Sequence, residues 1–309
     1  MKILCITPVT EPMMKNLKSK GNVDYHPRAD KILVKSLLAG GDYNVVFTNP
    51  NKQNFMLDEE VLRGSTVSVI CTASTGLNHI DIQYCRKNDI KVLSITKDYV
   101  ILEKISSTAE HSFALMMSLI RKIPTSFDSA KGGSWDWENF TGRQINQLTI
   151  GIVGLGRLGK MMAKYCDSFG AKVLVYDPHV DAGKYATVDS LGELFSSSDV
   201  VSLHVHVSED TRHFVNKSVF EKTTKPLYLI NTSRGEIVDE EAAIHALEDG
   251  SLAGYATDVL EDEFGDLSRS PILKRCDDLN IIVTPHIGGM TTDAREIAYN
   301  AAINKLGEL

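Results

Sequence analysis

The sequence has few cysteines, no long apolar run and no block of basic residues. Its five cysteines are far apart, odd in number and without a Cys-x-x-Cys pair. A disulfide framework and a zinc site are therefore disfavoured, and buried thiols in a reducing cytoplasm are expected. No apolar run approaches the roughly 18 residues of a membrane span. The sequence has no run of Lys and Arg interleaved with aromatic residues, so nucleic acid is not an expected partner.

What is present is the composition of a globular protein. Hydrophobic residues make up 43% and charged residues 24%, and the formal net charge is -7. The length of 309 residues allows two domains of ordinary size. No internal repeat or low-complexity segment interrupts the chain. The opening segment MKILCITPVT is too short in its apolar part for a signal peptide and is expected to be a first strand.

The N-terminal third alternates short apolar segments with charged helical ones. The apolar segments are KILCIT, YNVVFTN, TVSVICTAS and IKVLSIT. This alternation predicts right-handed βαβ units and a parallel sheet. A long helix is expected over 107–123, where Ser107 and Glu110 have the spacing of a capping box. Residues 129–147, rich in Gly, Ser and Asn, are expected to form a loop or hinge.

A second βαβ series starts at residue 148, and its glycines point to a dinucleotide. Six apolar strands follow one another: LTIGIVG, KVLVYD, DVVSLHV, LYLINTS, GYATDV and NIIVTPH. Gly154, Gly156 and Gly159 have the GxGxxG spacing directly after the first of them and open a helix. In such a turn the first glycine permits the tight bend, the second lets the backbone approach a pyrophosphate, and the third allows close packing of helix on strand.

The residue that ends the next strand, Asp177, indicates the cofactor. A carboxylate there can accept both ribose hydroxyls of adenosine, and it would repel the extra phosphate of NADP. No arginine follows it. NAD is therefore the expected cofactor, and the alternative is an aspartate that only caps a turn.

The pattern predicts an α/β protein with two Rossmann-like or flavodoxin-like parallel-sheet domains and a cleft between them. A helix over 291–309 follows the sixth strand and could return to the first domain. We therefore expect a discontinuous substrate-binding domain, 1–104 plus 290–309, and an NAD-binding domain, 105–289. The hexapeptide TPHIGG, 284–289, would lie near the cleft. Taken alone, its His286 is more often a turn residue than a catalyst.

Three segments after the glycine turn resemble a known family. They are NTSRGEIVDEEAAIHAL, ATDVLEDE and VTPHIGGMT, in this order. With STGLNHID and STAEHSFALMMSLIRKI they make the chain similar, over nearly its whole length, to the D-isomer-specific 2-hydroxyacid dehydrogenases, the family of D-3-phosphoglycerate dehydrogenase. The resemblance implies hydride transfer between NAD(H) and a 2-hydroxy or 2-keto acid.

The resemblance also implies roles for single residues. Arg234 would bind the C2 oxygen and carboxylate of the substrate. His286 would move the hydroxyl proton, and Glu263 would orient its imidazole. Asp258 would face the nicotinamide carboxamide. The backbone of Ser74, Thr75 and Gly76 would hold the substrate carboxylate. Further cofactor-binding candidates are Arg157, Leu158, Val205, Thr211, Thr232 and Gly288.

Other readings of these residues stay open. Arg234 could be a surface arginine at a helix start. Glu261 is close to Glu263, and only the family's spacing selects the latter. His79 and His206 would lie near the cleft. All the remaining histidines are nevertheless expected to be structural or on the surface: His26, His79, His111, His179, His204, His206, His213 and His245. No pair of them has metal-ligand spacing with a supporting carboxylate, so no metal is expected.

Departures from the family pattern bear on the substrate. Thr72 stands where phosphoglycerate dehydrogenases often have arginine, and His79 stands where asparagine is usual. Lys97, Lys104 and Arg143 are candidates to supply positive charge instead. Phosphoglycerate is the first substrate expectation, followed by hydroxypyruvate or glyoxylate. A non-enzymatic NAD(H)-sensing corepressor is the alternative of a different class. The resemblance also suggests a homodimer that associates through the nucleotide domains, and the cysteine usage makes a cytoplasmic location the expectation.

Overall fold

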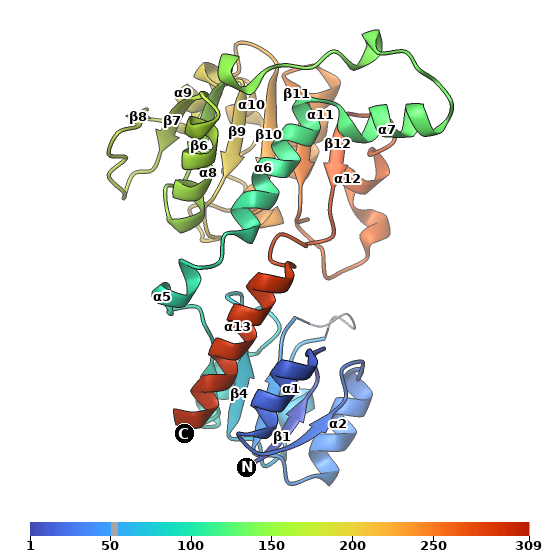
Figure 1. The fold of residues 1–309 in the computed structure, drawn as a ribbon, viewed down its shortest axis with the longest axis vertical. Coiled ribbons are helices and arrows are strands. Elements are labelled where there is room, and N and C mark those ends of the chain that lie inside the picture. The colour runs from blue at the N-terminus through green and yellow to red at the C-terminus, as the bar shows by residue number, and fades with distance from the viewer. Residues whose placement is uncertain (51–54, 309) are drawn as a thin grey trace. The chain divides into compact units, whose positions relative to one another are not determined.

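The chain forms two compact units, each built on a parallel sheet (Figure 1). The computed structural model describes residues 1–50 and 55–308, so Leu309, the end of the expected last helix, lies outside them. Unit 1 is Met1–Ile105 with Met290–Leu309, and unit 2 is Ser106–Gly289. In the described ranges, no helix is long and apolar enough to cross a membrane.

Unit 1 has a five-stranded sheet in the order β2-β1-β3-β4-β5. This is the strand order of flavodoxin-like folds. Its elements are β1 (Lys2–Cys5), α1 (Glu11–Lys18), β2 (Asn22–Tyr25), α2 (Lys31–Gly40), β3 (Val45–Thr48), α3 (Glu59–Leu62), β4 (Val69–Thr72), α4 (Ile82–Lys87), β5 (Lys91–Leu93), α5 (Tyr99–Leu102), α13 (Thr292–Lys305) and η5 (Leu306–Glu308).

Both faces of this sheet are buried. Successive side chains of a strand point to opposite faces, so neighbouring residues belong to different apolar clusters. Ile3 and Phe47 belong to one apolar cluster, and Leu4 and Val46 belong to the other. Helix α13 supplies part of the first cluster. Its Tyr299 packs edge-on against Phe47, with ring centroids 5.9 Å apart. The last helix of the chain is therefore an integral part of the unit 1 core.

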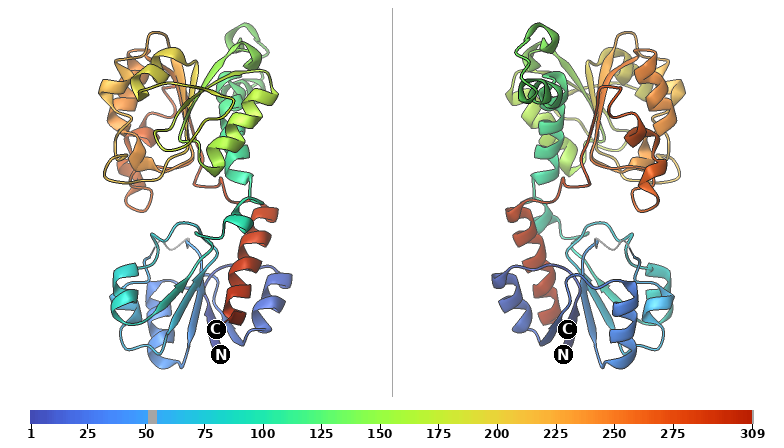
Figure 2. Two further views of the ribbon diagram at one scale, coloured as in Figure 1. Left: turned by 90° about the vertical axis from the view of Figure 1, so that its left-hand side faces the viewer. Right: turned by 90° about the vertical axis from the view of Figure 1, so that its right-hand side faces the viewer.

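Unit 2 has a seven-stranded sheet in the order β12-β11-β10-β9-β6-β7-β8. Helices lie on both faces of it (Figure 2). Its elements are α6 (Ser107–Ile120), α7 (Ile123–Lys131), η1 (Glu138–Phe140), η2 (Ile145–Gln147), β6 (Thr149–Val153), α8 (Arg157–Ser168), β7 (Lys172–Tyr176), β8 (Ala186–Thr187), α9 (Leu191–Ser197), β9 (Val200–Leu203), α10 (Lys217–Phe220), β10 (Leu227–Asn231), η3 (Gly235–Ile237), α11 (Glu240–Glu248), β11 (Leu252–Thr257), η4 (Leu267–Arg269), α12 (Pro271–Lys274) and β12 (Ile281–Val283).

The order of strands in unit 2 reverses at β6. β6 lies between β7 and β9, so the order along the chain reverses direction at this strand. Ligands of open parallel sheets bind at the carboxyl ends of strands beside such a switch point. The predicted α/β class with two parallel sheets is confirmed.

Several local predictions are wrong in detail. Strand β2 is missing from the expectation because its sequence, NVDY, is only partly buried and lacks an apolar run. The two-residue β8 adds a seventh strand to the expected six. The expected long helix ends at Ile120, and α7 then takes up the first residues of the expected loop. Lys122, with φ of 51°, makes the break between the two helices.

The predicted capping box is not formed in α6 as the structure describes it: the N-cap residue makes no side-chain cap hydrogen bond, and Glu110 lies one position past N3. The N-cap of α6 is Ser106, and its hydroxyl donates to Glu110 Oε1 at 2.5 Å. Ser107 is instead buried in the first turn, and its hydroxyl has no hydrogen-bond partner in the described chain.

Candidate active site

The glycine turn joins β6 to α8 and has two glycines that the fold itself requires. Gly154 has a φ of 84°, and a Cβ there would lie 2.6 Å from the His204 carbonyl oxygen. A Cβ on Gly159 would lie 2.0 Å from the Gly154 carbonyl oxygen. Both positions therefore demand glycine for close packing of the turn, the helix and the loop after β9.

Gly156 differs from its two neighbours in the motif. It is the N-cap residue of α8, and no side chain caps the helix there. A Cβ at this position would meet no atom within 4 Å. The fold thus leaves open space beside the first N–H groups of α8, where a pyrophosphate can bind. The residues present fit a dinucleotide.

Replacement of Gly156 by alanine tests this cradle. We expect Gly156→Ala to fold like the wild type, because the added methyl group meets no protein atom. We expect its Kd for NADH to rise at least about tenfold, since the methyl group would occupy the path of the pyrophosphate. Thermal unfolding and fluorescence titration measure the two effects. Wild-type affinity in this variant would contradict the assignment, and Gly159→Ala should lose the fold instead.

Asp177 stabilises the glycine turn, a contact that the sequence pattern does not reveal. Its Oδ2 accepts the Leu155 N–H at 2.7 Å, and its Oδ1 accepts the N–H groups of His179 and Val180. Each carboxylate oxygen can accept more than one hydrogen bond. The same side chain can therefore hold the turn and accept ribose hydroxyls, so the capping and binding readings are compatible.

The other cofactor-binding candidates come from unit 2 as well. Val205 follows β9, and Thr211 closes the same loop by donating to the His206 carbonyl oxygen at 2.7 Å. Thr232 is buried and pairs with Ser112 of α6 at 2.6 Å. Arg157 and Leu158 begin α8. Burial lowers the pKa of Arg157.

Arg234 follows β10 in a turn that is packed against another loop of the site. Its Nη1 donates to the Ser233 carbonyl oxygen at 2.6 Å, and its own carbonyl accepts from the Asn231 side chain. A Cβ on the next residue, Gly235, would lie 1.9 Å from the Leu260 carbonyl carbon and 2.1 Å from the Glu261 nitrogen. The turn that carries Arg234 thus contacts the backbone of the loop that leads to Glu263.

The charges beneath that loop include a buried carboxyl group. Glu240, in the first turn of α11, accepts the Glu261 N–H at 2.9 Å. Burial raises the pKa of Glu240. Glu261 itself pairs with His213 Nε2 at 2.7 Å. Glu261 therefore fastens the loop, and the neighbouring Glu263 is the carboxylate that meets His286.

Glu263 and His286 form a hydrogen-bonded pair. Glu263 Oε1 lies 2.8 Å from His286 Nδ1, and the other carboxylate oxygen is buried without a partner in the described chain. A carboxylate accepts only, so Nδ1 carries the proton that joins them. Nε2 is then the nitrogen available to a substrate hydroxyl. His286 has a φ of 54°, an uncommon backbone conformation of the kind found at functional sites.

Asp258 anchors the turn that carries His286. It directly follows β11 and is 2% exposed. Its Oδ1 accepts from Thr284 Oγ1 at 2.6 Å and from the Ile287 N–H at 2.8 Å, and its Oδ2 accepts the Gly288 N–H at 2.7 Å. Its carbonyl oxygen accepts the His286 N–H at 2.8 Å. The family resemblance predicts that this carboxylate faces the nicotinamide. In the structure its hydrogen bonds stabilise the turn.

The expected substrate loop, residues 74–76, follows β4 in unit 1. Thr72 is fully buried, and its hydroxyl accepts the Ser74 N–H at 3.2 Å and contacts His79 Nε2 at 3.1 Å. Ser74 Oγ accepts the Gly76 N–H, and the Thr75 carbonyl accepts from Thr96. The loop is thus shaped by its own hydroxyl groups.

The burial of His79 predicts a pH dependence of stability. Burial lowers its pKa to about 4, whereas an unfolded histidine has a pKa of about 6.5. The unfolded chain therefore binds the extra proton first as the pH falls. Stability from the neutral imidazole is complete above about pH 6.5 and is lost progressively down to about pH 4. We expect about 2 kcal/mol less pH-dependent destabilisation in His79→Asn than in the wild type between about pH 7 and pH 4.5.

Urea denaturation of both proteins at the two pH values measures this difference. His179→Asn is the control, because His179 is exposed in the loop after β7 and should leave the wild-type dependence of stability on pH unchanged. Equal losses of stability in the wild type and His79→Asn would contradict the prediction.

Arg143, one of the three side chains suggested as a positive charge for a substrate phosphate, has another role. Arg143 Nη1 pairs with Asp199 Oδ1 at 2.8 Å, and Lys225 pairs with the same oxygen. Asp199 directly precedes β9, so this cluster lies at the amino edge of the sheet, opposite the glycine turn. Arg143 is therefore no candidate for a substrate phosphate. Lys97 and Lys104 are exposed on unit 1.

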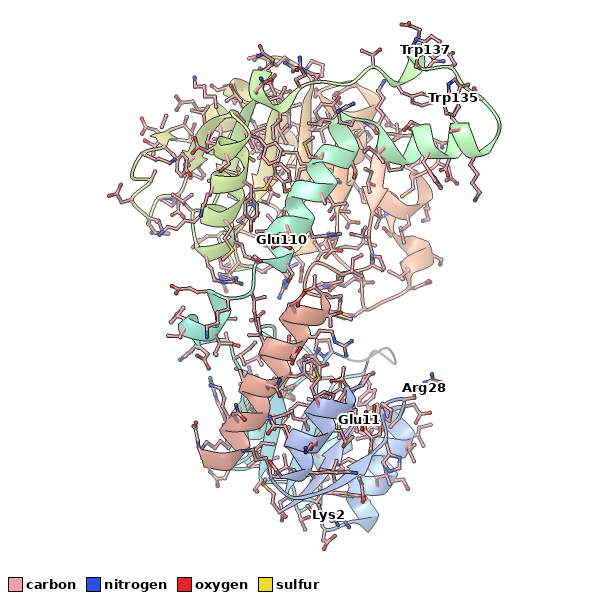
Figure 3. The ribbon with its side chains drawn as sticks, viewed as in Figure 1. Lys2, Glu11, Arg28, Glu110, Trp135 and Trp137 are labelled. Atoms are coloured by element: carbon pink, nitrogen blue, oxygen red, sulfur yellow. The ribbon has the colours of Figure 1, made fainter. Side chains whose placement is uncertain are left out.

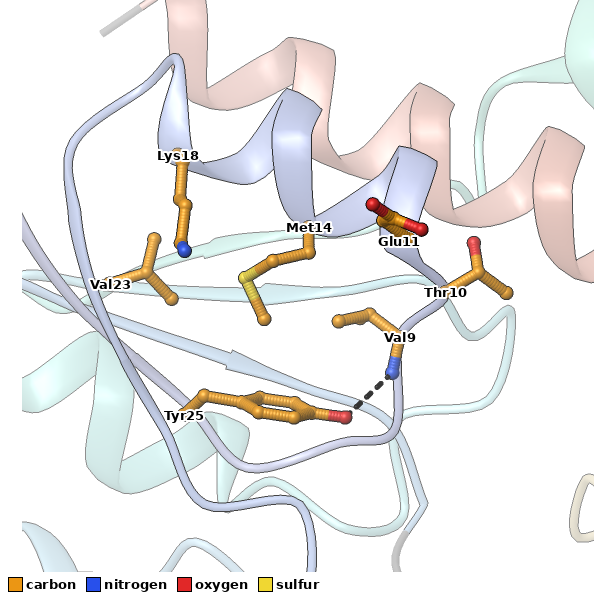
Figure 4. A pocket seen from close by; sticks show the side chains of 7 residues that line it. All are labelled: Val9, Thr10, Glu11, Met14, Lys18, Val23 and Tyr25. Carbon is orange, nitrogen blue, oxygen red and sulfur yellow. Dashed lines mark hydrogen bonds between the residues drawn. The ribbon is translucent and has the colours of Figure 1, made fainter.

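Hollows and metal-ligand groups do not point to another centre of chemistry. A hollow of ≈ 330 Å³ in unit 1 lies between α1 and β2, with Lys18 and Tyr25 in its lining (Figure 4). None of the candidate residues above lines it. Among residues 1–50 and 55–308, no group of three or more His, Cys, Asp or Glu side chains could hold a metal ion.

Comparison with known proteins decides the family. The model of the D-isomer specific 2-hydroxyacid dehydrogenase NAD binding domain matches residues 113–288, more than half of the chain. The chain belongs to the D-isomer specific 2-hydroxyacid dehydrogenase family. The matched residues all lie in unit 2.

Relatives within this family have different names. A glyoxylate reductase of Thermofilum pendens is 36% identical over 267 residues, which cover 82% of this chain and 75% of that protein. A D-3-phosphoglycerate dehydrogenase of Bacillus subtilis is 35% identical over 236 residues, which cover 75% of this chain and 43% of that protein. The chain spans about half the length of the phosphoglycerate dehydrogenases that it matches.

One solved structure is similar to this chain over the sequence of both units. The D-lactate dehydrogenase of Aquifex aeolicus, solved with NAD and lactic acid, is 29% identical and has a TM-score of 0.81. The similarity covers 99% of this chain and 94% of that one.

Proposed function

We propose that this protein is an NAD-dependent D-2-hydroxyacid dehydrogenase that interconverts a 2-hydroxy acid and its 2-keto acid. The observation that carries the proposal is the 2.8 Å contact between Glu263 and His286 at the carboxyl edge of the unit 2 sheet. A histidine that is oriented by a carboxylate is the group expected to move the proton of a reacting hydroxyl. Family membership supports the same reaction.

Each remaining candidate has a role in this proposal. Bound NAD(H) supplies the hydride chemistry. His286 Nε2 takes the hydroxyl proton when the hydroxy acid is oxidised and returns it to the carbonyl oxygen in the reverse direction. The guanidinium of Arg234 binds the C2 oxygen and the carboxylate. The 74–76 loop binds the substrate carboxylate. Since the Ser74 and Gly76 N–H groups already donate to the hydroxyls of Thr72 and Ser74, the Thr75 N–H is the donor that we assign to this contact.

The cofactor preference is proposed from Asp177. Asp177 directly follows β7, and its carboxylate accepts three backbone N–H groups, one of them from Leu155 in the glycine turn. A negative charge at this position repels a 2′-phosphate. We therefore expect NADH to be used in preference to NADPH.

The substrate has two candidates within one reaction class. Phosphoglycerate is the first by resemblance to the phosphoglycerate dehydrogenases. An unphosphorylated acid such as glyoxylate or hydroxypyruvate is the second, and the burial of Thr72 favours it. Threonine is uncharged, so position 72 supplies no positive charge to a distal phosphate. The Thr72 hydroxyl contacts His79 and Ser74 instead. The similarity to a glyoxylate reductase supports the second candidate too.

A screen of NADH oxidation with 2-keto acids tests the function. The panel contains glyoxylate, hydroxypyruvate, pyruvate and 3-phosphohydroxypyruvate, each with NADH and with NADPH. We expect kcat/KM for the best unphosphorylated acid to exceed that for the phosphorylated one at least about tenfold, since no arginine occupies position 72. A higher kcat/KM for the phosphorylated acid would reverse the choice of substrate. NADH binding without turnover of any 2-hydroxy or 2-keto acid would favour the sensor instead.

A homodimer through unit 2 is also part of the proposal. Exposed aromatic side chains gather on residues 123–140, where Phe127 is 64%, Trp135 81% and Trp137 71% exposed. Figure 3 labels the two tryptophans on the segment that follows α7. Aromatic clusters of this kind are typical of protein interfaces. Light scattering should give a dimer for the wild type and a monomer for Phe127→Ser with Trp135→Ser. A dimeric double variant would contradict this surface.

A further inference from the structure

The polar contacts of the His286 turn extend to His111, a side chain that the sequence analysis expects to be structural or on the surface. His111 lies on α6, which packs against β10, β11 and β12 (Figure 1). Its Nε2 lies 2.9 Å from Thr284 Oγ1 and 3.3 Å from Asp258 Oδ1. The His111 imidazole thus connects α6 to the turn by polar contacts.

The neighbours of His111 determine where its proton lies. Burial acts to raise the pKa of Asp258, but hydrogen bonds from His111, Thr284 and two backbone N–H groups leave it below its ordinary value. Asp258 is therefore ionised and only accepts. The Thr284 hydroxyl has one proton and donates it to Asp258 Oδ1 at 2.6 Å. The Thr284 oxygen must then accept from His111, so Nε2 of His111 carries a proton.

This arrangement connects α6 to the backbone of the turn on both sides of His286. Thr284 precedes it, and its hydroxyl receives the His111 proton. Asp258, which His111 also contacts, accepts the N–H groups of Ile287 and Gly288 behind it. His286, whose φ of 54° is uncommon, therefore lies between two segments of backbone that these hydrogen bonds hold.

We propose that His111 is a positioning residue that holds the His286 turn in its reactive conformation through Thr284 and Asp258. The inference deepens the proposed function and rests on it for its catalytic part. The polar hydrogen of His111 Nε2 does not touch the substrate in this scheme. It fixes the backbone that places His286 and Glu263 together.

Two substitutions distinguish a positioning role of His111 from a role in packing alone. His111→Leu fills a similar volume but removes the donor, so Thr284 Oγ1 loses a hydrogen bond and Asp258 Oδ1 loses a polar contact at 3.3 Å. His111→Gln places an N–H donor near the position of Nε2 and should restore the contact. His245→Leu, an exposed histidine on α11, is the control for loss of an imidazole.

Hydrogen exchange of the turn tests the positioning without reference to catalysis. We expect the amides of Ile287 and Gly288 to exchange at least about tenfold faster in His111→Leu than in the wild type, because their acceptor is less firmly held. His111→Gln and His245→Leu should exchange at the wild-type rate. Unchanged exchange in His111→Leu, or equal acceleration in His111→Gln, overturns the proposal.

Steady-state kinetics with the best 2-keto acid of the panel tests the consequence. We expect His111→Leu to lower kcat about 10- to 100-fold, because small displacements of a catalytic group have effects of this size. The Kd for NADH should stay within about twofold, and His111→Gln should recover kcat to within about threefold. Faster exchange with wild-type kcat overturns the catalytic part. If the wild type turns over no 2-keto acid, the proposed function fails while the exchange result still decides the positioning.

Discussion

Replacement of His286 by alanine is expected to lower kcat at least about 10³-fold, while the Kd for NADH stays within about twofold of wild type. The imidazole is the group that exchanges a proton with the reacting oxygen, and Glu263 holds its Nδ1 at 2.8 Å. The glycine turn and Asp177, which we assign to the cofactor, belong to other loops of unit 2. Steady-state kinetics and fluorescence titration of NADH measure the two effects separately.

Two further variants make this result specific. Glu263→Gln keeps an oxygen that can accept the Nδ1 proton but loses the charge, so its kcat should lie between those of the wild type and His286→Ala. His245→Ala removes an exposed imidazole and should leave kcat unchanged. Retention of wild-type turnover in His286→Ala would show that another group moves the proton.

Replacement of Gly235 by alanine is expected to destabilise the protein by at least about 3 kcal/mol and to abolish most activity. A Cβ there would lie 1.9 Å from the Leu260 carbonyl carbon and 2.1 Å from the Glu261 nitrogen. Backbone atoms on both sides cannot yield as a flexible side chain would. The loop after β11 must move, and Glu263 must move with it away from His286.

Urea denaturation and kinetics measure both consequences. Gly40→Ala is the matched control, because a Cβ at Gly40 meets no atom within 4 Å. Gly40 ends α2, so alanine there should be neutral or stabilising by up to about 1 kcal/mol. Wild-type stability and turnover in Gly235→Ala would mean that the Arg234 turn and the Glu263 loop are not in contact.

The class of fold follows from features that are local in the sequence. Apolar segments of strand length, separated by helical ones, predict parallel sheets because each segment has to bury both faces. Strand β2 escapes this logic since it lies at an edge of its sheet and is only partly buried. The predicted capping box is wrong because Ser106, and not Ser107, is the N-cap of α6, which leaves Glu110 outside position N3.

The candidate site divides in the same way. Arg234, Glu263 and His286 were recognisable as a set because their motifs follow strands in a fixed order. The structure supplies the contact between Glu263 and His286, whereas the substrate roles remain proposals. Asp177 and Asp258 have structural hydrogen bonds that no motif reveals, because their partners are backbone N–H groups of other loops.

By itself the sequence determined the α/β class, the family resemblance and the set of residues from which the chemistry is drawn, because these depend on residue types and their order. Only the tertiary structure decided that Gly156 has open space while Gly159 has none, that Gly235 lies against Leu260, and that His111 reaches Thr284. The physical reason is that such contacts join residues far apart in the chain, and their distances arise when strands and helices pack.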